Sequence, residues 1–496
     1  MSKENATGNR EDAAIYSEIE ESCDVTADKS CSSLCPFMTV HDKLKHALHC
    51  CFFLFIIGLM EYLTLGKPNV VDSSYLRPWE KYGVFFTCVL YGLRFVTLLP
   101  LPQATFNFVG MIFYNTFPGK VVLRSSPLLS PLICVRVVTR GDYPQLVKDN
   151  VARNMKTCLD TGLENFYIEV VSDQPLNLPC NPRIRELVVP EEYNTSSGAM
   201  YKARALQYCL EEKNNMLSDN DWIVHLDEET LLTPNCLRGI LNFALDGKYD
   251  IGQGLITYAN EEIVNWFTTL ADGFRVADDM GKLQFQFKMF HKPLFSFKGS
   301  YVVTQYGTEK AVSFDNGPDG SIAEDCFFAI KAFSEGYSFN FIEGEMWEKS
   351  PFTLKDLVQQ RKRWLQGILL VVHSKALPWK CKILLTLSCY AWVTIPLAVS
   401  NIILVPLYPL PSFLVLDSLM SFVGAVNIYM FIFGALKSFN LKRYGVFKYF
   451  LCLIGSVAVI PVNALLEITA VMWGYFGRKH VFYIVRKGTT PTEDVV

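Results

Sequence analysis

The sequence predicts an α/β domain inserted between two blocks of transmembrane helices. The chain of 496 residues is 50% hydrophobic, and its mean hydropathy of +0.19 is high for a soluble protein. The apolar residues gather near both ends, and the roughly 265 residues between them have the mixed composition of one globular domain. In that central part short β-branched runs alternate with helical patterns, which favours a parallel sheet.

The N-terminal block combines a polar tail with two apolar runs. We predict a disordered cytosolic tail over residues 1–45 and two transmembrane helices over residues 46–102, because each run approaches the roughly 20 residues that cross a bilayer. Glu61 and Arg94 are expected to snorkel to the interface or to pair with each other. The short aromatic run from Phe106 is expected to lie along the membrane interface.

The C-terminal block, residues 383–476, is expected to hold three or more spans, followed by a tail over residues 477–496. Loop cations such as Lys43 and Lys437 mark cytoplasmic ends, which places the central domain in the cytosol after two crossings. Three further crossings would leave the cations of the tail outside, so the segment broken by Pro461 is a candidate re-entrant hairpin. We therefore expect a multi-pass protein of the Golgi or the endoplasmic reticulum.

The central domain, residues 115–380, opens with two strand–helix units. The first strand ends at Thr139, and the second is followed directly by a carboxylate, Asp173. A helix that carries Lys202 precedes the next strand. Because ligands bind beyond the carboxyl ends of such strands, these positions are candidates for a binding site. A solvated surface lysine remains the alternative for Lys202.

The next apolar strand ends in "HLDEET", which gathers three acidic residues. Alternation along an extended chain puts Asp227 and Glu229 on one side. Two carboxylates there suit Mg²⁺ or Mn²⁺, with substrate phosphates completing the shell. A solvated acidic turn is the alternative for this motif taken alone.

Two further motifs follow along the chain. Glu324-Asp325 stands at the start of an apolar helix, where the helix dipole favours carboxylates, so capping is the alternative to catalysis. The sequence "QRKRW", residues 360–364, lies in a predicted amphipathic helix over residues 353–375 that is expected at the membrane interface. The order of all these motifs, more than any one of them, favours a catalytic site.

That order is similar to the one in glycosyltransferases of the GT-A fold, which include cellulose, chitin and hyaluronan synthases and ceramide glucosyltransferase. The resemblance implies a divalent metal, Mn²⁺ or Mg²⁺, on Asp227 and Glu229, where it would neutralise a departing diphosphate. It also implies that Asp325 is the catalytic base, since burial raises the proton affinity of a carboxylate. It assigns nucleotide-sugar binding to Thr139, Asp173, Lys202, Gln360 and Arg363, and acceptor binding to Trp364.

Over nearly the whole chain the motifs "VHLDEET", "FDNGPDGSIAEDCFFA" and "VQQRKRWLQGI" resemble the egghead-type β-1,4-mannosyltransferases of invertebrates. This resemblance implies transfer of mannose from GDP-mannose to glucosylceramide in the bilayer, with inversion at the anomeric carbon. The alternatives are a processive polysaccharide synthase or a ceramide glucosyltransferase-like enzyme that uses a UDP-sugar, and a non-enzymatic transporter or scaffold. No nucleic-acid partner is expected.

Helical winding sorts the side chains of residues 353–375 into faces. Gln360, Arg363 and Trp364 share a face that is expected to point into the donor and acceptor site. An apolar stripe beside them is expected to lie on the membrane interface. Arg361 interrupts this stripe and is expected to snorkel to lipid phosphates.

Overall fold

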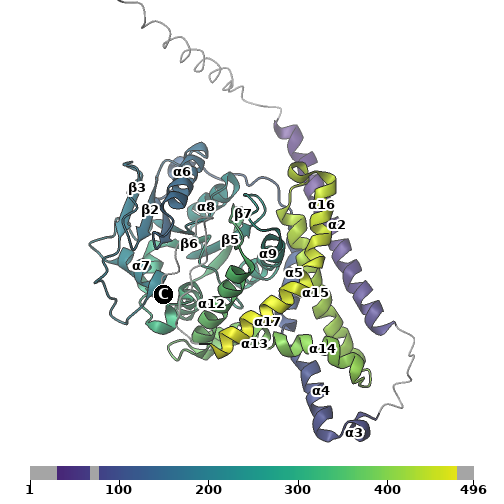
Figure 1. Cartoon of the computed structure of the whole chain (residues 1–496). Coiled ribbons are helices and arrows are strands. Elements are labelled where there is room, and N and C mark those ends of the chain that lie inside the picture. Colours follow the sequence, from purple (N-terminus) through teal and green to yellow (C-terminus); the bar gives the residue numbers. More distant parts are fainter. Residues whose placement is uncertain (1–30, 67–76, 478–496) are drawn as a thin grey trace, which may run out of the picture.

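The computed structural model of the chain describes residues 31–66 and 77–477. A globular domain lies beside an elongated bundle of helices, as Figure 1 shows. Residues 1–30 and 478–496 of the two predicted tails lie outside the described residues. Helix α2 (Cys31–Leu65) begins before the predicted end of the first tail, so residues 31–45 are helical instead of disordered.

The globular domain is built on one sheet of seven strands in the order β3-β2-β1-β4-β6-β5-β7. The strands are β1 (Ile133–Thr139), β2 (Phe166–Ser172), β3 (Ile184–Val188), β4 (Trp222–Asp227), β5 (Ile251–Thr257), β6 (Val302–Gln305) and β7 (Phe339–Trp347). The α/β prediction is confirmed, but the sheet is mixed, because β6 runs antiparallel to both β4 and β5. The apolar pattern of a strand this short carries no information about its direction.

The helices of the globular domain complete the α/β layers. They are α6 (Pro144–Asp160), α7 (Tyr201–Leu210), α8 (Pro234–Asp246), α9 (Trp266–Asp278), α10 (Tyr306–Val312), α11 (Glu324–Glu335) and α12 (Leu354–His373). Two short π-helical segments, Asp279–Leu283 and Gln286–Phe290, follow α9.

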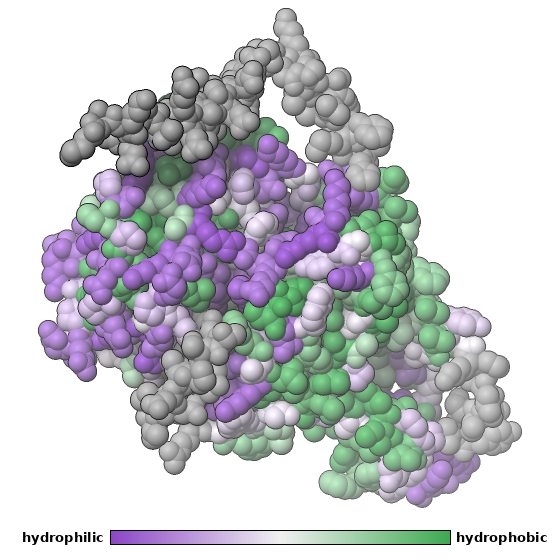
Figure 2. Space-filling view, turned by 45° about the horizontal axis from the view of Figure 1, so that its top comes forward, coloured by the Kyte–Doolittle hydropathy of each residue, from purple (hydrophilic) through white to green (hydrophobic). Residues whose placement is uncertain are grey.

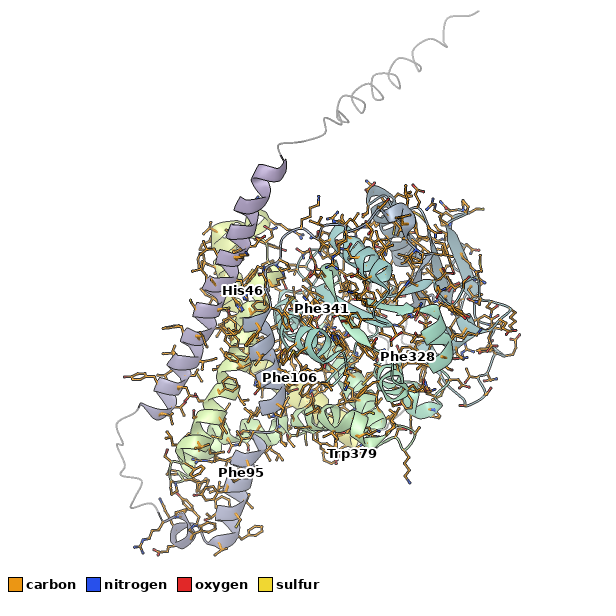
Figure 3. The ribbon with its side chains drawn as sticks, turned by 180° about the vertical axis from the view of Figure 1, so that it is seen from behind. His46, Phe95, Phe106, Phe328, Phe341 and Trp379 are labelled. Carbon is orange, nitrogen blue, oxygen red and sulfur yellow. The ribbon has the colours of Figure 1, made fainter. Side chains whose placement is uncertain are left out.

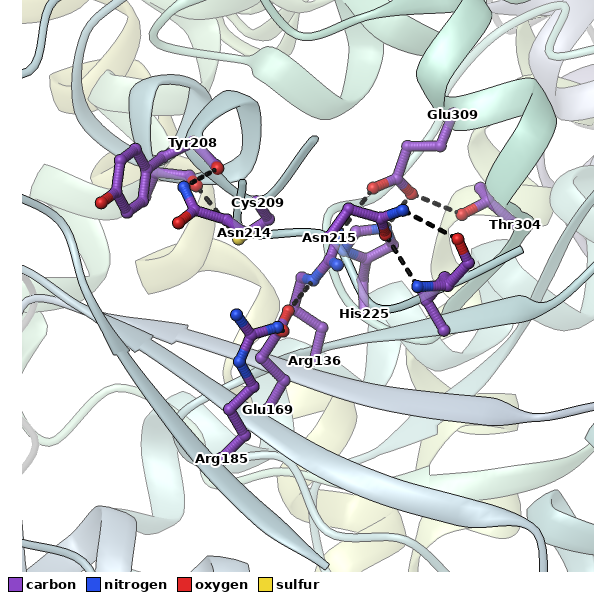
Figure 4. A network of polar contacts seen from close by, with 12 residues as sticks. Arg136, Glu169, Arg185, Tyr208, Cys209, Asn214, Asn215, His225, Thr304 and Glu309 are labelled. Atoms are coloured by element: carbon purple, nitrogen blue, oxygen red, sulfur yellow. Dashed lines mark hydrogen bonds and ion pairs between the residues drawn. The ribbon is translucent and has the colours of Figure 1, made fainter. Parts of the chain in front are cut away.

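A buried row of charges fixes the register of the sheet, as Figure 4 shows. Arg136 on β1 donates to Glu169 on β2 at 2.7 Å and to Glu309 on α10 at 2.9 Å. His225 on β4 lies 2.6 Å from the same Glu309 carboxylate. Arg136 stands opposite both Glu169 and His225 in the strand pairing. Because a buried charge without its partner is costly, a slip of one residue between these strands is strongly disfavoured.

The helical bundle holds three helices in the described part of the chain that are long and apolar enough to cross a membrane, and up to five if each bent pair counts as one span. The three are Asp42–Leu65, Val84–Phe113 and Leu414–Ser438 (α15). The bent pairs are α13 (Trp379–Val393) with α14 (Ile395–Leu407), at 49°, and α16 (Leu441–Ala458) with α17 (Ile460–Phe476), at 45°. Figure 2 shows hydrophobic surface over this bundle and hydrophilic surface over the globular domain. The chain is therefore a membrane protein.

The aromatic run from Phe106 does not form a separate interfacial segment. It lies in α5 (Leu101–Phe113), which continues α4 (Val84–Val96) as one candidate span of 30 residues; the short helix α3 (Pro78–Lys81) precedes them. The Phe106 ring lies 4.8, 5.5 and 4.7 Å from those of Phe285, Phe290 and Phe295. Figure 3 shows Phe106 between the bundle and the globular domain. This segment therefore docks the bundle onto the domain.

Glu61 and Arg94 do not pair with each other. Arg94 lies 3.8 Å from Asp417, and the Ser418 hydroxyl donates to Glu61 at 3.1 Å. Both partners belong to α15, so the two predicted snorkelling side chains instead bind the same neighbouring helix. This matches the expectation that charged groups inside a membrane face protein partners.

The α16–α17 pair bends by 45° next to Pro461, and both of its ends contact other parts of the chain. Near its beginning Arg443 donates to the Glu261 carbonyl at 3.1 Å, and near its end the Gly474 carbonyl accepts from Gln366 on α12 at 3.1 Å. Both ends thus contact the globular domain, and the re-entrant hairpin around Pro461 stays a prediction. The number of membrane crossings stays a prediction.

The apolar stripe of α12 is covered by protein. Leu357, Leu365 and Val372 are at most 4% exposed, and α12 packs against α13 and α17. Arg361 is also buried: it donates to Asp272 at 2.8 Å and lies 3.3 Å from Glu467 on α17. The prediction that Arg361 snorkels to lipid is therefore wrong, because α9 of the globular domain and α17 of the bundle supply its counter-ions.

Candidate active site

One cavity of about 1240 Å³ contains all of the predicted site residues. They come from the carboxyl ends of β1, β2 and β4 and from α7, α11 and α12. The set comprises Thr139, Asp173, Lys202, Asp227, Glu229, Asp325, Gln360, Arg363 and Trp364. The structure brings these positions together, and the role of each stays a prediction.

The first two strand ends are braced by polar contacts. The Thr139 hydroxyl donates to the carboxylate of Glu228, and Gly141 donates its backbone N–H to Thr139 at 3.0 Å. Asp173 accepts from Arg204 on α7 at 2.9 Å. Sequence reasoning missed Arg204, whose partner lies 31 residues away along the chain. These contacts hold the predicted nucleotide side of the cavity in place.

Lys202 sits among carboxylates. It donates to Asp227 at 2.6 Å and to the Gly299 carbonyl at 3.2 Å, and it lies 3.8 Å from Glu324. Burial lowers the pKa of Lys202, but Asp227 and Glu324 outweigh burial and leave that pKa above its ordinary value. A solvated lysine is therefore excluded, and Lys202 stays a cation inside the cavity.

Asp227 and Glu229 share their end of the cavity with a third carboxylate, Glu348. Burial, and then repulsion from Glu229 and Asp227, raises the pKa of Glu348 to about 7. Three carboxylates whose charges repel one another are hard oxygen donors that a divalent cation would neutralise, so the donor set fits Mg²⁺ or Mn²⁺. Sequence reasoning missed Glu348, although it follows the last strand directly, as Asp173 follows β2.

Asp325 has the environment of a general base. Burial, followed by repulsion from Glu324, raises the pKa of Asp325 to about 7. Its Oδ1 accepts from the Cys326 backbone N–H at 2.7 Å, which fixes the carboxylate at the start of α11. Gly299 lies beside it: a Cβ on that glycine would stand 3.1 Å from Asp325 Oδ2. A base is most effective when its pKa is near the working pH.

Helix α12 presents two polar groups to these carboxylates. Gln360 Oε1 is buried and has no hydrogen-bond partner among the described residues, which suits an atom that meets a ligand. Burial lowers the pKa of Arg363, while Glu324 and Asp227 act to raise it. Gly367 allows the close approach, because a Cβ there would stand 2.7 Å from that of Ala323, next to the start of α11.

Trp364 is held by two guanidinium groups. Arg275 on α9 and Arg361 on α12 each lie 4.7 Å from the Trp364 ring centroid. Asp272 anchors both cations, at 3.5 Å from Arg275 and 2.8 Å from Arg361. The aromatic surface predicted for the acceptor is thus oriented by residues far apart in the sequence.

The cavity does not end at the globular domain. It continues between membrane helices, whose residues make up the rest of its lining. Among them are Val96 from the end of α4, Gln103 from α5, Val399 and Ile402 from α14, Val423 and Asn427 from α15, and Asn463 from α17. One end of the cavity is charged and the other is largely apolar.

One cavity holds a carboxylate with a raised pKa, a cluster of acidic side chains and an arginine, and its apolar end opens among membrane helices. Transfer of a sugar from a diphosphate donor uses groups of these kinds. These features define a membrane-bound glycosyltransferase. Residues 222–437 match the family model described as glycosyl transferase family group 2. The β-1,4-mannosyltransferase egh of Drosophila melanogaster is 62% identical over 92% of this chain and 100% of the relative. The β-1,4-mannosyltransferase bre-3 of Caenorhabditis elegans is 57% identical over 90% of this chain and 98% of the relative.

The chain therefore belongs to the egghead-type β-1,4-mannosyltransferases, as its motifs predicted, and the transporter or scaffold interpretation is wrong. Among solved structures, S. aureus TarS 1-349 aligns with a TM-score of 0.32 at 11% identity, over 68% of this chain and 90% of that one.

Proposed function

We propose that this enzyme transfers mannose from GDP-mannose to the 4-hydroxyl of glucosylceramide in one in-line, inverting displacement. Asp325 takes the proton of the acceptor hydroxyl, the hydroxyl oxygen forms a bond to the mannose anomeric carbon, and the bond from that carbon to the GDP oxygen breaks. This proposal is supported above all by the cavity, which extends from the buried carboxylates to the membrane helices. A water-soluble acceptor needs no such extension.

The donor lies at the strand ends in this proposal. Arg363 offers a planar fork of donors to the diphosphate, which a lysine cannot reproduce, and Gln360 adds a polar contact from the same helix face. Asp173 and Thr139 line the nucleotide end, and Lys202 adds positive charge between Asp227 and Glu324. Asp227 and Glu229 would hold a divalent cation, Mn²⁺ or Mg²⁺, which supplies charge that neutralises the departing diphosphate.

The acceptor lies at the other end. Trp364 offers a flat face to the glucose ring, and the ceramide extends along the apolar lining toward α14 and α15. The cationic connection between α15 and α16 supports a cytosolic active site: Lys437 donates to the Thr116 carbonyl at 2.9 Å, and Arg443 contacts the globular domain. This connection thus lies on the side of the catalytic domain, the side that the positive-inside rule assigns to the cytosol. We place the enzyme in the Golgi or endoplasmic reticulum membrane.

The donor and linkage are tested with membranes that contain the enzyme. Labelled GDP-mannose, UDP-glucose and UDP-N-acetylglucosamine are each incubated with glucosylceramide, and lipid products are separated and treated with α- or β-mannosidase. We expect one added sugar, from GDP-mannose alone, that only β-mannosidase removes. A polymer made from a UDP-sugar, or an α-linked product, would refute the proposal.

The base is tested in the same assay. Asp325→Asn keeps the size of the side chain and should lower turnover by roughly 10²- to 10⁴-fold, the usual contribution of a general base. Asp319→Asn is the matched control, since Asp319 precedes α11 but is not part of the cavity lining. Full activity of Asp325→Asn would exclude Asp325 as the base.

A further inference from the structure

Two carboxamides on membrane helices line the cavity without a side-chain hydrogen bond to the part of the chain that the structure describes. Asn427 on α15 and Asn463 on α17 both line it, and neither side chain makes a hydrogen bond with any other described residue. Asn401 on α14, by contrast, donates to the Leu93 carbonyl at 2.8 Å and is not part of the lining. Polar groups in apolar surroundings are costly unless paired, and inside membranes they mark functional sites. The two cavity amides therefore call for a ligand.

Each amide lies one helical turn from a residue that adjoins the surroundings of Trp364. Asn427 precedes Phe431 by four residues, and the Phe431 ring lies 5.2 Å from that of Phe274, the neighbour of Arg275. Asn463 precedes Glu467 by four residues, and Glu467 lies 3.3 Å from Arg361. Four residues advance an α-helix by about 6 Å. Each amide is thus about one helical turn away from a residue, Phe431 or Glu467, that lies near one of the two arginines at the Trp364 ring.

An occupant of this part of the cavity must combine polar and apolar parts. Farther along α15, on the same face, the lining is Gly424, Val423 and Met420, and across it stand Val399 and Ile402 of α14. A lipid with a sugar at Trp364 would place its hydrocarbon there. Between sugar and hydrocarbon it would present its backbone to the two amides.

We propose that Asn427 and Asn463 recognise the amide and hydroxyl groups of a sphingoid backbone, and so select a ceramide-based acceptor over a glycerol-based one. This inference rests on the proposed function. A carboxamide both donates and accepts hydrogen bonds, and so do a secondary amide and a hydroxyl. The esters of a diacylglycerol only accept, so they leave the carbonyl oxygens of both asparagines unsatisfied.

The selection is tested with the purified full-length enzyme, GDP-mannose and three acceptors. Glucosylceramide carries the sphingoid backbone, glucosyl-diacylglycerol carries esters, and octyl β-glucoside carries neither. Asn427→Leu and Asn463→Leu should each lower kcat/KM for glucosylceramide by roughly threefold to tenfold, as expected for a lost hydrogen bond. They should leave kcat/KM for octyl β-glucoside within about twofold, since it lacks the matching groups, and should lower that for glucosyl-diacylglycerol less than that for glucosylceramide, since its esters match only the donors of the asparagines. Equal loss on all three acceptors, or no loss on glucosylceramide, would overturn the inference.

Two further measurements keep the test decisive. Asn401→Leu removes a membrane amide that is not part of the lining and should not change the ratio between acceptors. The unaltered enzyme is also given glucosylceramide methylated at its amide nitrogen, which lacks one donor; an undiminished rate would overturn the inference without any variant. If the unaltered enzyme transfers mannose to none of the glucosides, the proposed function fails instead.

Discussion

Arg361 provides the sharpest test of how the catalytic domain is joined to its membrane helices. Its guanidinium lies 2.8 Å from Asp272, which is fully buried, and 3.3 Å from Glu467 on α17. A snorkelling arginine would tolerate replacement by lysine, because lipid phosphates accept either cation. An arginine whose buried guanidinium lies between two carboxylates would not tolerate this replacement. We expect Arg361→Lys to be destabilising and Arg361→Met to be more so.

The expected loss of stability depends on the partners that Asp272 and Glu467 keep when Arg361 is replaced. Removing one member of a buried ion pair costs about 3–5 kcal/mol. In Arg361→Met the Asp272 carboxylate keeps Arg275 at 3.5 Å, and Glu467 keeps the Trp392 indole N–H at 3.0 Å. The low end of the range, about 3 kcal/mol, is therefore expected. At about 2–4 °C per kcal/mol, this lowers Tm by about 6–12 °C.

The assay is thermal unfolding of the detergent-solubilised enzyme, followed by loss of the monodisperse peak in size-exclusion chromatography. Lys355→Met is the matched control, because Lys355 is an exposed cation on the same helix. We expect the control to stay within about 1 °C, since surface substitutions rarely change stability by more than 0.5 kcal/mol. Unchanged Tm values for both Arg361 variants would refute the buried network and restore the lipid-facing interpretation.

Three more predictions follow from the site and the bundle. Since burial and Glu324 raise the pKa of Asp325 to about 7, and a base acts only when deprotonated, the pH–rate profile should rise through about pH 7; a flat profile from pH 5 to 8 would contradict this. Arg363→Lys should lower kcat/KM for GDP-mannose by roughly tenfold, because a lysine cannot make the bidentate contact that we propose with the diphosphate, while membrane retention, measured by fractionation, stays unchanged. Gly434→Ala should lower Tm, because its Cβ would overlap the Gly273 carbonyl where α15 packs on α9. Overpacking of this kind costs about 1–3 kcal/mol. Gly424→Ala is the control, because a Cβ added there has room.

The strand-end positions were predictable because strand alternation and parallel pairing are local rules. Asp227 ends β4, Asp173 follows β2, and the carboxyl ends of these parallel strands meet at one edge. The partners of the same residues were not predictable. Arg361 finds Asp272 and Glu467, which lie 89 and 106 residues away in opposite directions along the chain. A helical wheel ranks faces by polarity, so it assigned Arg361 to lipid when the true counter-ions stand on other helices.

The role of Glu348 and the direction of β6 also depend on contacts between distant parts of the chain, so they were not predictable from the sequence either. Glu348 follows an apolar strand as Asp173 does, but its importance rests on the proximity of Asp227 and Glu229, which only the sheet order establishes. The reversal at β6 brings Gly299 and Ser300, just before that strand, to the end of β4, where Ser300 accepts from the Asp227 backbone at 3.3 Å. A parallel strand in that place would enter the sheet from the opposite edge.

The contacts around Trp364 show why the catalytic and membrane parts form one functional unit. The two cations on its ring share the carboxylate of Asp272, and one of them, Arg361, also contacts Glu467, which in turn accepts from Trp392 on α13. The orientation of the predicted sugar-binding surface is thus set jointly by α9 of the catalytic domain and by α13 and α17 of the bundle. Any displacement of those helices when a lipid enters the cavity would be transmitted to Trp364 through charged contacts that tolerate little stretching in a buried setting. We therefore predict that lipid binding, in the proposed function, is coupled to the alignment of the sugar through Arg361.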